Sequence, residues 1–74
     1  MKSVLDIFAE RLKELMGENH LNIKELSEKI GIPRSTINSW TLKRKIPKID
    51  NLYIVCMFFN VSSNYLIGIE NERY

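Results

Sequence analysis

The sequence predicts an all-α fold, a single compact domain of five short helices that contains a helix-turn-helix. Three observations support this prediction. The chain has 74 residues, which is enough for one domain and no more. Apolar residues recur at spacings of three and four, the period of a helix with one buried face. The one segment of strand-like composition, 52–59, would have no other strand with which to pair.

The first two helices are predicted from the residues that can cap them. Ser3 can cap a helix, with Asp6 three residues later completing a weak capping box, and this helix should run to about Met16 and stop near Gly17. Its apolar face consists of Leu5, Phe8, Leu12 and Leu15. A second cap signature is formed by Asn22 and Glu25, and the apolar stripe that follows consists of Ile23, Leu26 and Ile30.

A tight turn should join the second helix to a third one. Gly31 can adopt a left-handed conformation and so end the second helix. The third helix is expected over 34–42, with Ile37 and Trp40 pointing inward. Two short helices joined by a glycine-containing turn form a helix-turn-helix, with the second helix presented outward.

The fourth helix, over about 49–59, carries more apolar residues than one buried face needs. Such a helix is usually buried all round, so we expect a second copy of the chain to cover its outer side. The expected dimer interface consists of Ile54, Met57, Phe58, Tyr65 and Ile67. A short fifth helix should follow Ser62. We expect the domain to comprise residues 1–69, with a short polar C-terminal tail over 70–74.

Charge is distributed unevenly along the chain. The net charge of +2 divides into −1 for residues 1–30, +5 for residues 31–49 and −2 for residues 50–74. The middle segment holds five basic residues and no acid, and it includes the whole predicted third helix. A run of charge is often only a solvated face, but a run without any acid favours a polyanionic partner.

Composition argues against several other classes of protein. One Cys cannot form a disulfide within the chain, and one Cys with one His cannot make a four-ligand zinc site. The longest apolar run, 52–59, is eight residues, too short to cross a bilayer, and no secretory signal opens the chain. His20 has no nucleophile near it in the sequence. We expect a cytoplasmic protein without catalytic activity, cofactor, metal or small-molecule ligand.

The stretch from Ile23 to Trp40 resembles the helix-turn-helix of the lambdoid phage repressor/Cro family. Later positions also match the fourth and fifth helices of that family at the expected spacings: Pro47, Leu52, Val55, Cys56, Phe59, Val61, Ser62, Leu66 and Gly68. The resemblance covers about residues 5–68. It implies a five-helix domain that binds operator DNA, usually as a symmetric dimer.

The resemblance, together with the predicted free face of the third helix, implies a set of DNA contacts. Base edges in the major groove are expected to be read by Arg34, Ser35, Asn38 and Ser39. Phosphates are expected to be contacted by Asn22, Ile23, Thr36, Lys43, Arg44 and Lys45.

The chain departs from the family pattern at several positions. Ile23 stands where the family usually has a phosphate-binding Gln, so only backbone N–H groups and Asn22 remain there for this role. Met16 and Thr41 replace a frequent buried Arg–Glu pair, and both partners are absent together. Lys43 replaces a frequent Gly after the third helix.

The expected function is a DNA-binding transcriptional regulator, a repressor that binds a pseudo-palindromic operator as a dimer. Two alternatives remain open at this point. One is an antitoxin-type regulator that also binds a toxin. The other is a protein-interaction module that has kept the fold and lost DNA binding.

Overall fold

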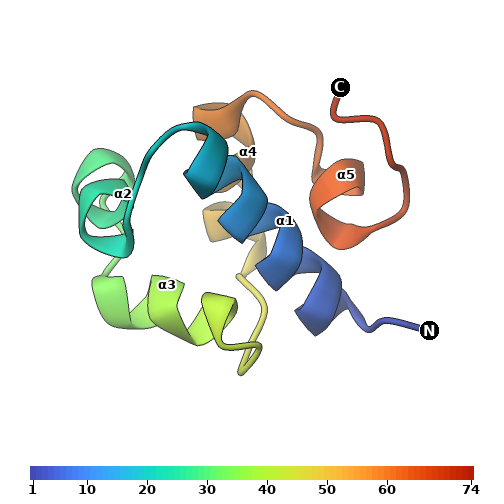
Figure 1. Ribbon diagram of the computed structural model, residues 1–74, viewed down its shortest axis with the longest axis horizontal. Helices are drawn as coiled ribbons and strands as arrows, with labels where there is room; N and C mark the ends of the chain where they lie inside the picture. The colour runs from blue at the N-terminus through green and yellow to red at the C-terminus, as the bar shows by residue number, and fades with distance from the viewer.

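The computed structural model describes residues 1–74 and consists of five α-helices without a strand (Figure 1). They are α1 (Val4–Glu18), α2 (Ile23–Ile30), α3 (Arg34–Thr41), α4 (Ile49–Phe59) and α5 (Ser63–Ile67). The predicted all-α class and the number of helices are confirmed. None of these helices is both long and apolar enough to span a bilayer.

Helix α1 begins as expected but ends later than its sequence suggests. The hydroxyl of Ser3 accepts from the Asp6 N–H, and the Asp6 carboxylate accepts from the Ser3 N–H, so the capping box is complete. The helix continues to Glu18, one residue past the predicted stop near Gly17. Asn19 ends it, with its side-chain amide donating to the Leu15 carbonyl at 2.8 Å. A glycine inside a helix costs only about 1 kcal/mol, which the packing of the neighbouring core residues offsets.

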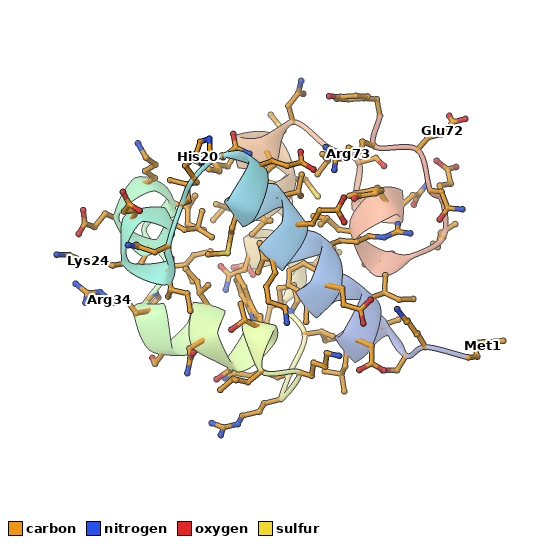
Figure 2. The ribbon with its side chains drawn as sticks, in the orientation of Figure 1. Met1, His20, Lys24, Arg34, Glu72 and Arg73 are labelled. Carbon is orange, nitrogen blue, oxygen red and sulfur yellow. The ribbon has the colours of Figure 1, made fainter.

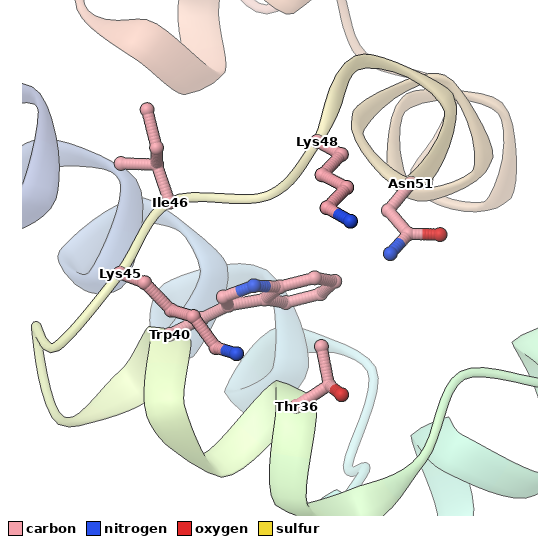
Figure 3. Close-up of a pocket in the computed structure, with 6 residues that line it drawn as sticks. All are labelled: Thr36, Trp40, Lys45, Ile46, Lys48 and Asn51. Carbon is pink, nitrogen blue, oxygen red and sulfur yellow. The ribbon is translucent and has the colours of Figure 1, made fainter.

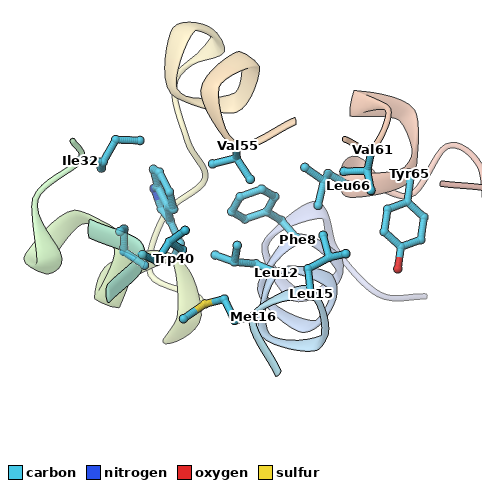
Figure 4. Packing of buried hydrophobic residues seen from close by; sticks show 12 residues of the cluster. Phe8, Leu12, Leu15, Met16, Ile32, Trp40, Val55, Val61, Tyr65 and Leu66 are labelled. Carbon is cyan, nitrogen blue, oxygen red and sulfur yellow. The ribbon is translucent and has the colours of Figure 1, made fainter. Parts of the chain in front are cut away.

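The core lies where α1 crosses the other helices (Figure 4). Its two largest fully buried side chains are Trp40 and Phe8, whose rings meet edge to face with centroids 5.7 Å apart. The other buried members of the cluster are Leu12, Leu15, Met16, Leu26, Ile32, Ile37, Val55, Val61, Tyr65 and Leu66. Met16, at the position where the family frequently has an Arg, therefore fills core space as an apolar side chain.

The outer face of α4 differs in part from the expected one. Ile54 is half-buried and packs against the core, and Tyr65 of α5 is 5% exposed within it. Tyr65 therefore has almost no surface to offer a second copy, which removes it from the predicted interface, whereas Ile54 and Ile67 each keep part of their surface. The exposed stripe instead consists of Ile49, Tyr53 and Met57, with Phe58 partly exposed beside it. These stripe residues stand four apart, so they follow one side of the helix.

The C-terminal segment does not extend into solvent but folds back over α5 (Figure 1). The Arg73 carbonyl accepts from the Ser62 N–H at 2.6 Å, and the Arg73 side chain reaches α1. The predicted polar tail therefore packs against the domain.

Candidate nucleic-acid interface

The turn between α2 and α3 is fixed by three neighbouring residues. Gly31 has φ +72° and donates its N–H to the Ser27 carbonyl at 2.9 Å. The Ser27 hydroxyl donates to the Ile32 carbonyl at 2.6 Å, and the Ile32 side chain is buried. A small hydroxyl residue at position 27 thus secures the turn, and Ile32 anchors it. Sequence reasoning missed Ile32 because a lone apolar residue in a turn carries no periodicity.

Helix α3 has one buried face and one free face. Ile37 and Trp40 are fully buried, as predicted. On the opposite side Arg34, Ser35 and Asn38 are exposed. In Figure 1, α3 lies along the lower edge of the molecule with no other helix below it. The helix can therefore approach a partner without rearrangement of the domain.

Two polar residues of α3 are less free than the sequence suggests. Ser39 is half-buried, and its hydroxyl donates to the Ser35 carbonyl one turn earlier at 2.9 Å. Its oxygen still has lone pairs for a donor. Thr36 is half-buried as well and faces a pocket beside the helix.

The start of α2 is capped by Asn22, whose Oδ1 accepts from the Glu25 N–H at 2.8 Å. This bond leaves the Asn22 amide group and the N–H of Ile23 for an anion. Figure 2 shows Lys24 and Arg34 projecting from the same end of the molecule. Sequence reasoning did not select Lys24 because it lies in a helix of mixed charge.

Three consecutive basic residues, 43–45, follow α3 and differ in their surroundings. Lys43 has φ +61°, a conformation that suits glycine, and its Nζ lies 3.4 Å from Asp6 Oδ1 and 3.5 Å from Glu10 Oε2. Its charge is therefore directed towards α1. Arg44 and Lys45 are exposed and form no ion pair within the chain. Lys43 therefore differs from Arg44 and Lys45, the other two expected phosphate contacts of the loop, because its charge is already paired.

A pocket of about 210 Å³ opens between α3, the loop and the start of α4 (Figure 3). Its lining consists of Thr36, Trp40, Lys45, Ile46, Lys48 and Asn51. Two ammonium groups, a hydroxyl and an amide border it, and no carboxylate belongs to the lining. Such a set of groups suits an oxyanion. Sequence reasoning missed Lys48 and Asn51 as site residues, although Lys48 belongs to the acid-free run.

The carboxyl groups whose pKa is shifted all belong to α1, and each pKa is lowered. The hydrogen bond from the Ser3 hydroxyl, with further contributions from the Ser3 N–H and Lys43, lowers the pKa of Asp6. The hydrogen bond from Lys2 lowers the pKa of Glu10. Asp6 and Glu10 are thus paired with Lys2 and Lys43, whereas Arg44, Lys45 and Lys48 of the loop and pocket have no acidic partner in the chain.

The free face of α3, the fixed turn and the flanking basic groups together define a helix-turn-helix domain. A family model described as helix-turn-helix matches residues 12–66, and the chain belongs to this Cro/C1-type family. The chain is 30% identical over 66 residues to a Bacillus subtilis (strain 168) protein named as the uncharacterized HTH-type transcriptional regulator YobD. The match covers 89% of this chain and 59% of that relative. No solved structure gives a significant match.

Proposed function

We propose that this chain is a sequence-specific DNA-binding transcriptional regulator, a repressor, that places α3 in the major groove. The observation that carries the proposal is the exposed face of α3 beside basic groups that no acid of the chain neutralises. Exposed Arg and Asn side chains on such a helix can form paired hydrogen bonds with guanine and adenine edges. Membership of a helix-turn-helix family, and a relative named as a transcriptional regulator, support the same function.

Base contacts are assigned to Arg34, Ser35 and Asn38, which are exposed, and to Ser39, whose hydroxyl oxygen can still accept. Arg34 stands at the first position of α3 and suits a bidentate contact to guanine. Asn38 lies one turn further along and suits adenine.

Phosphate contacts are assigned to groups that flank α3 on both sides. On one side they are the α2 N-terminus at Asn22 and Ile23. On the other side they are Arg44, Lys45 and the pocket over Trp40, in which Lys48, Thr36 and Asn51 would surround a phosphate oxygen. Lys43 is a weaker candidate for a phosphate contact because Asp6 and Glu10 already pair with its charge.

A homodimer on a two-fold operator is part of the proposal. One copy presents a single α3 of eight residues, which can read only a short half-site. The exposed apolar stripe of Ile49, Tyr53 and Met57 supports a second copy at α4, with Phe58 and Ile67 at its margin. Two copies would then read both halves of a pseudo-palindrome.

The roles of the basic residues can be separated by measuring affinity for a selected site and for random duplex across a range of salt. Arg34→Ala should lose about 1–3 kcal/mol on the selected site and relax preference at one base pair. Lys45→Ala should weaken both duplexes alike and make the salt dependence shallower by about one unit. Lys29→Ala, an exposed lysine on α2, is the control.

Equal losses on both duplexes for Arg34→Ala and Lys45→Ala would contradict this division of roles. Absence of any salt-dependent binding to duplex DNA would overturn the proposal and favour a protein-interaction module.

A further inference from the structure

The C-terminal segment 69–74 is fastened to α5 at both of its ends. The N–H groups of Ile69 and Glu70 donate to the Asn64 carbonyl at 2.9 and 3.2 Å. The Arg73 carbonyl accepts from the Ser62 N–H, at the residue that caps α5. Both ends of the segment are therefore hydrogen-bonded to the α5 region, although most of its side chains are exposed.

The guanidinium of Arg73 contacts a site, here called the seat, that consists of Glu14, Glu18 and the ring of Tyr65. Nη1 donates to Glu18 Oε1 at 2.7 Å, and Nη2 donates to Glu18 Oε2 at 2.5 Å and to Glu14 Oε1 at 3.1 Å. The same group lies over the Tyr65 ring, 5.5 Å from its centroid. In Figure 2, Arg73 points inward to α1, whereas the neighbouring Glu72 points away from the molecule.

Helices α1 and α5 set the backbone positions of the residues that contact Arg73. Glu14 and Glu18 stand one turn apart on α1, and Tyr65 is buried between the helices. Arg11 lies 4.4 Å from the centre of the same ring and donates to the carbonyls of Tyr65 and Glu70. Helix α5 also approaches α1 closely, since a Cβ at Gly68 would lie 2.7 Å from Ile7 Cδ1.

These groups match the chemistry of an arginine side chain. A carboxylate that accepts two parallel N–H bonds fits a planar guanidinium, and an aromatic face adds a cation–π contribution. A lysine ammonium lacks the planar fork and fits such a seat less well.

We propose that Glu14, Glu18 and the ring of Tyr65 form a binding site for an arginine guanidinium, which Arg73 fills from within the chain. The filled site holds the segment 69–74 closed as a latch. This site lies on the side of α1 and α5, apart from α3, so the proposal does not depend on DNA binding (Figure 1).

The latch can be opened in the full chain by Arg73→Ala. The melting temperature should fall by about 4–8 °C. The Ser62 amide, which bonds to the Arg73 carbonyl, should exchange with solvent faster. Arg44→Ala removes an exposed arginine without an ion pair, and should change neither quantity. Glu18→Gln leaves residue 73 as arginine but removes its charged partner, and it should open the latch in the same way. Unchanged exchange at Ser62 in both seat variants would overturn the proposal.

The specificity of the seat can be tested by returning the missing group to Arg73→Ala as ethylguanidinium. At concentrations in the tens of millimolar, this cation should raise the melting temperature and restore protection of the Ser62 amide. Ethylammonium at the same concentration should do neither. The unmodified chain, whose seat is filled, and the double variant Arg73→Ala, Glu18→Gln should not respond. An equal response to both cations, or in the double variant, would show that no guanidinium site exists.

Discussion

Trp40 joins α3 to the rest of the molecule. Its indole is fully buried, meets Phe8 edge to face and forms part of the pocket beside α3. Trp40→Ala should therefore destabilise the fold by about 3–5 kcal/mol. This is most of the free energy of unfolding of a small domain, so the variant should be largely unfolded by circular dichroism. Tyr74→Ala, at an exposed aromatic residue outside the proposed interface, is the matched control and should melt as the unmodified chain does.

Lys43 combines a strained backbone with weak ion pairs. A residue with a Cβ pays about 1 kcal/mol or more in the left-handed region, which glycine avoids. The pairs with Asp6 and Glu10 are exposed and contribute less than that. Lys43→Gly should therefore be more stable than Lys43→Ala by about 1 kcal/mol in urea denaturation.

A comparison of Lys43→Gly with Lys45→Ala tests where the Lys43 charge acts. Because the acids of α1 already hold its ammonium group, Lys43→Gly should alter the salt dependence of DNA binding less than Lys45→Ala does. If Lys43→Gly changed the salt dependence of DNA affinity as much as Lys45→Ala does, Lys43 would have to be counted among the phosphate contacts.

At the scale of elements, α1 carries four acids at successive positions four apart: Asp6, Glu10, Glu14 and Glu18. Like charges at this spacing destabilise a helix unless cations compensate them. The compensating cations come from the N-terminal segment, the α3–α4 loop and the C-terminal segment, and they are Lys2, Lys43 and Arg73.

The four acids of α1 and their cations make the stability of the protein sensitive to low pH. The hydrogen bond from Arg73 holds the pKa of Glu18 below its usual 4.5. A carboxyl whose pKa is lowered in the folded state contributes stability that is present above the unfolded pKa and is lost as pH falls through the folded one. The melting temperature should thus decline as the pH falls below about 4.5. The decline should be shallower in Arg73→Ala, and a parallel decline in both chains would contradict the pairing.

At the scale of the whole molecule, the exposed stripe of α4 and the size of the domain bear on assembly. The chain measures 30 × 24 × 22 Å, so the centres of two adjoining copies would be separated by a length comparable to one turn of DNA, about 34 Å, which is the spacing of two half-sites. A two-fold axis at Tyr53 would set Ile49 of one copy against Met57 of the other.

Met57→Glu should separate the proposed dimer without unfolding it, because Met57 is 64% exposed and the new charge would be desolvated only in the dimer. Sedimentation of both chains at high micromolar concentration measures this. Lys29→Gln, on α2, changes the net charge by the same single unit and is the control. A monomeric unmodified chain, or a Met57→Glu chain that remains dimeric, would exclude the α4 stripe as the interface.

The sequence by itself determined which segments are helices and which face of α3 is buried. Caps act on N–H and carbonyl groups within about four residues, so Ser3, Asn22, Gly31 and Ser62 set their helix ends locally. The burial of Ile37 and Trp40 follows from periodicity in the same way. Gly17 lies one residue inside the end of α1, because its local penalty is small beside the packing of the residues before it.

Only the tertiary structure decided which charges are free and which apolar residues are exposed. Arg73 and Glu18 are 55 residues apart in the sequence, and Arg11 and Tyr65 are 54 apart. Tyr65 is buried because α5 lies on α1, and Lys43 is neutralised because its loop returns to the start of α1. The pocket over Trp40 likewise needs α3, the loop and α4 to meet. Such contacts join residues that are far apart in the sequence. They depend on how the helices pack, which the local sequence pattern does not specify.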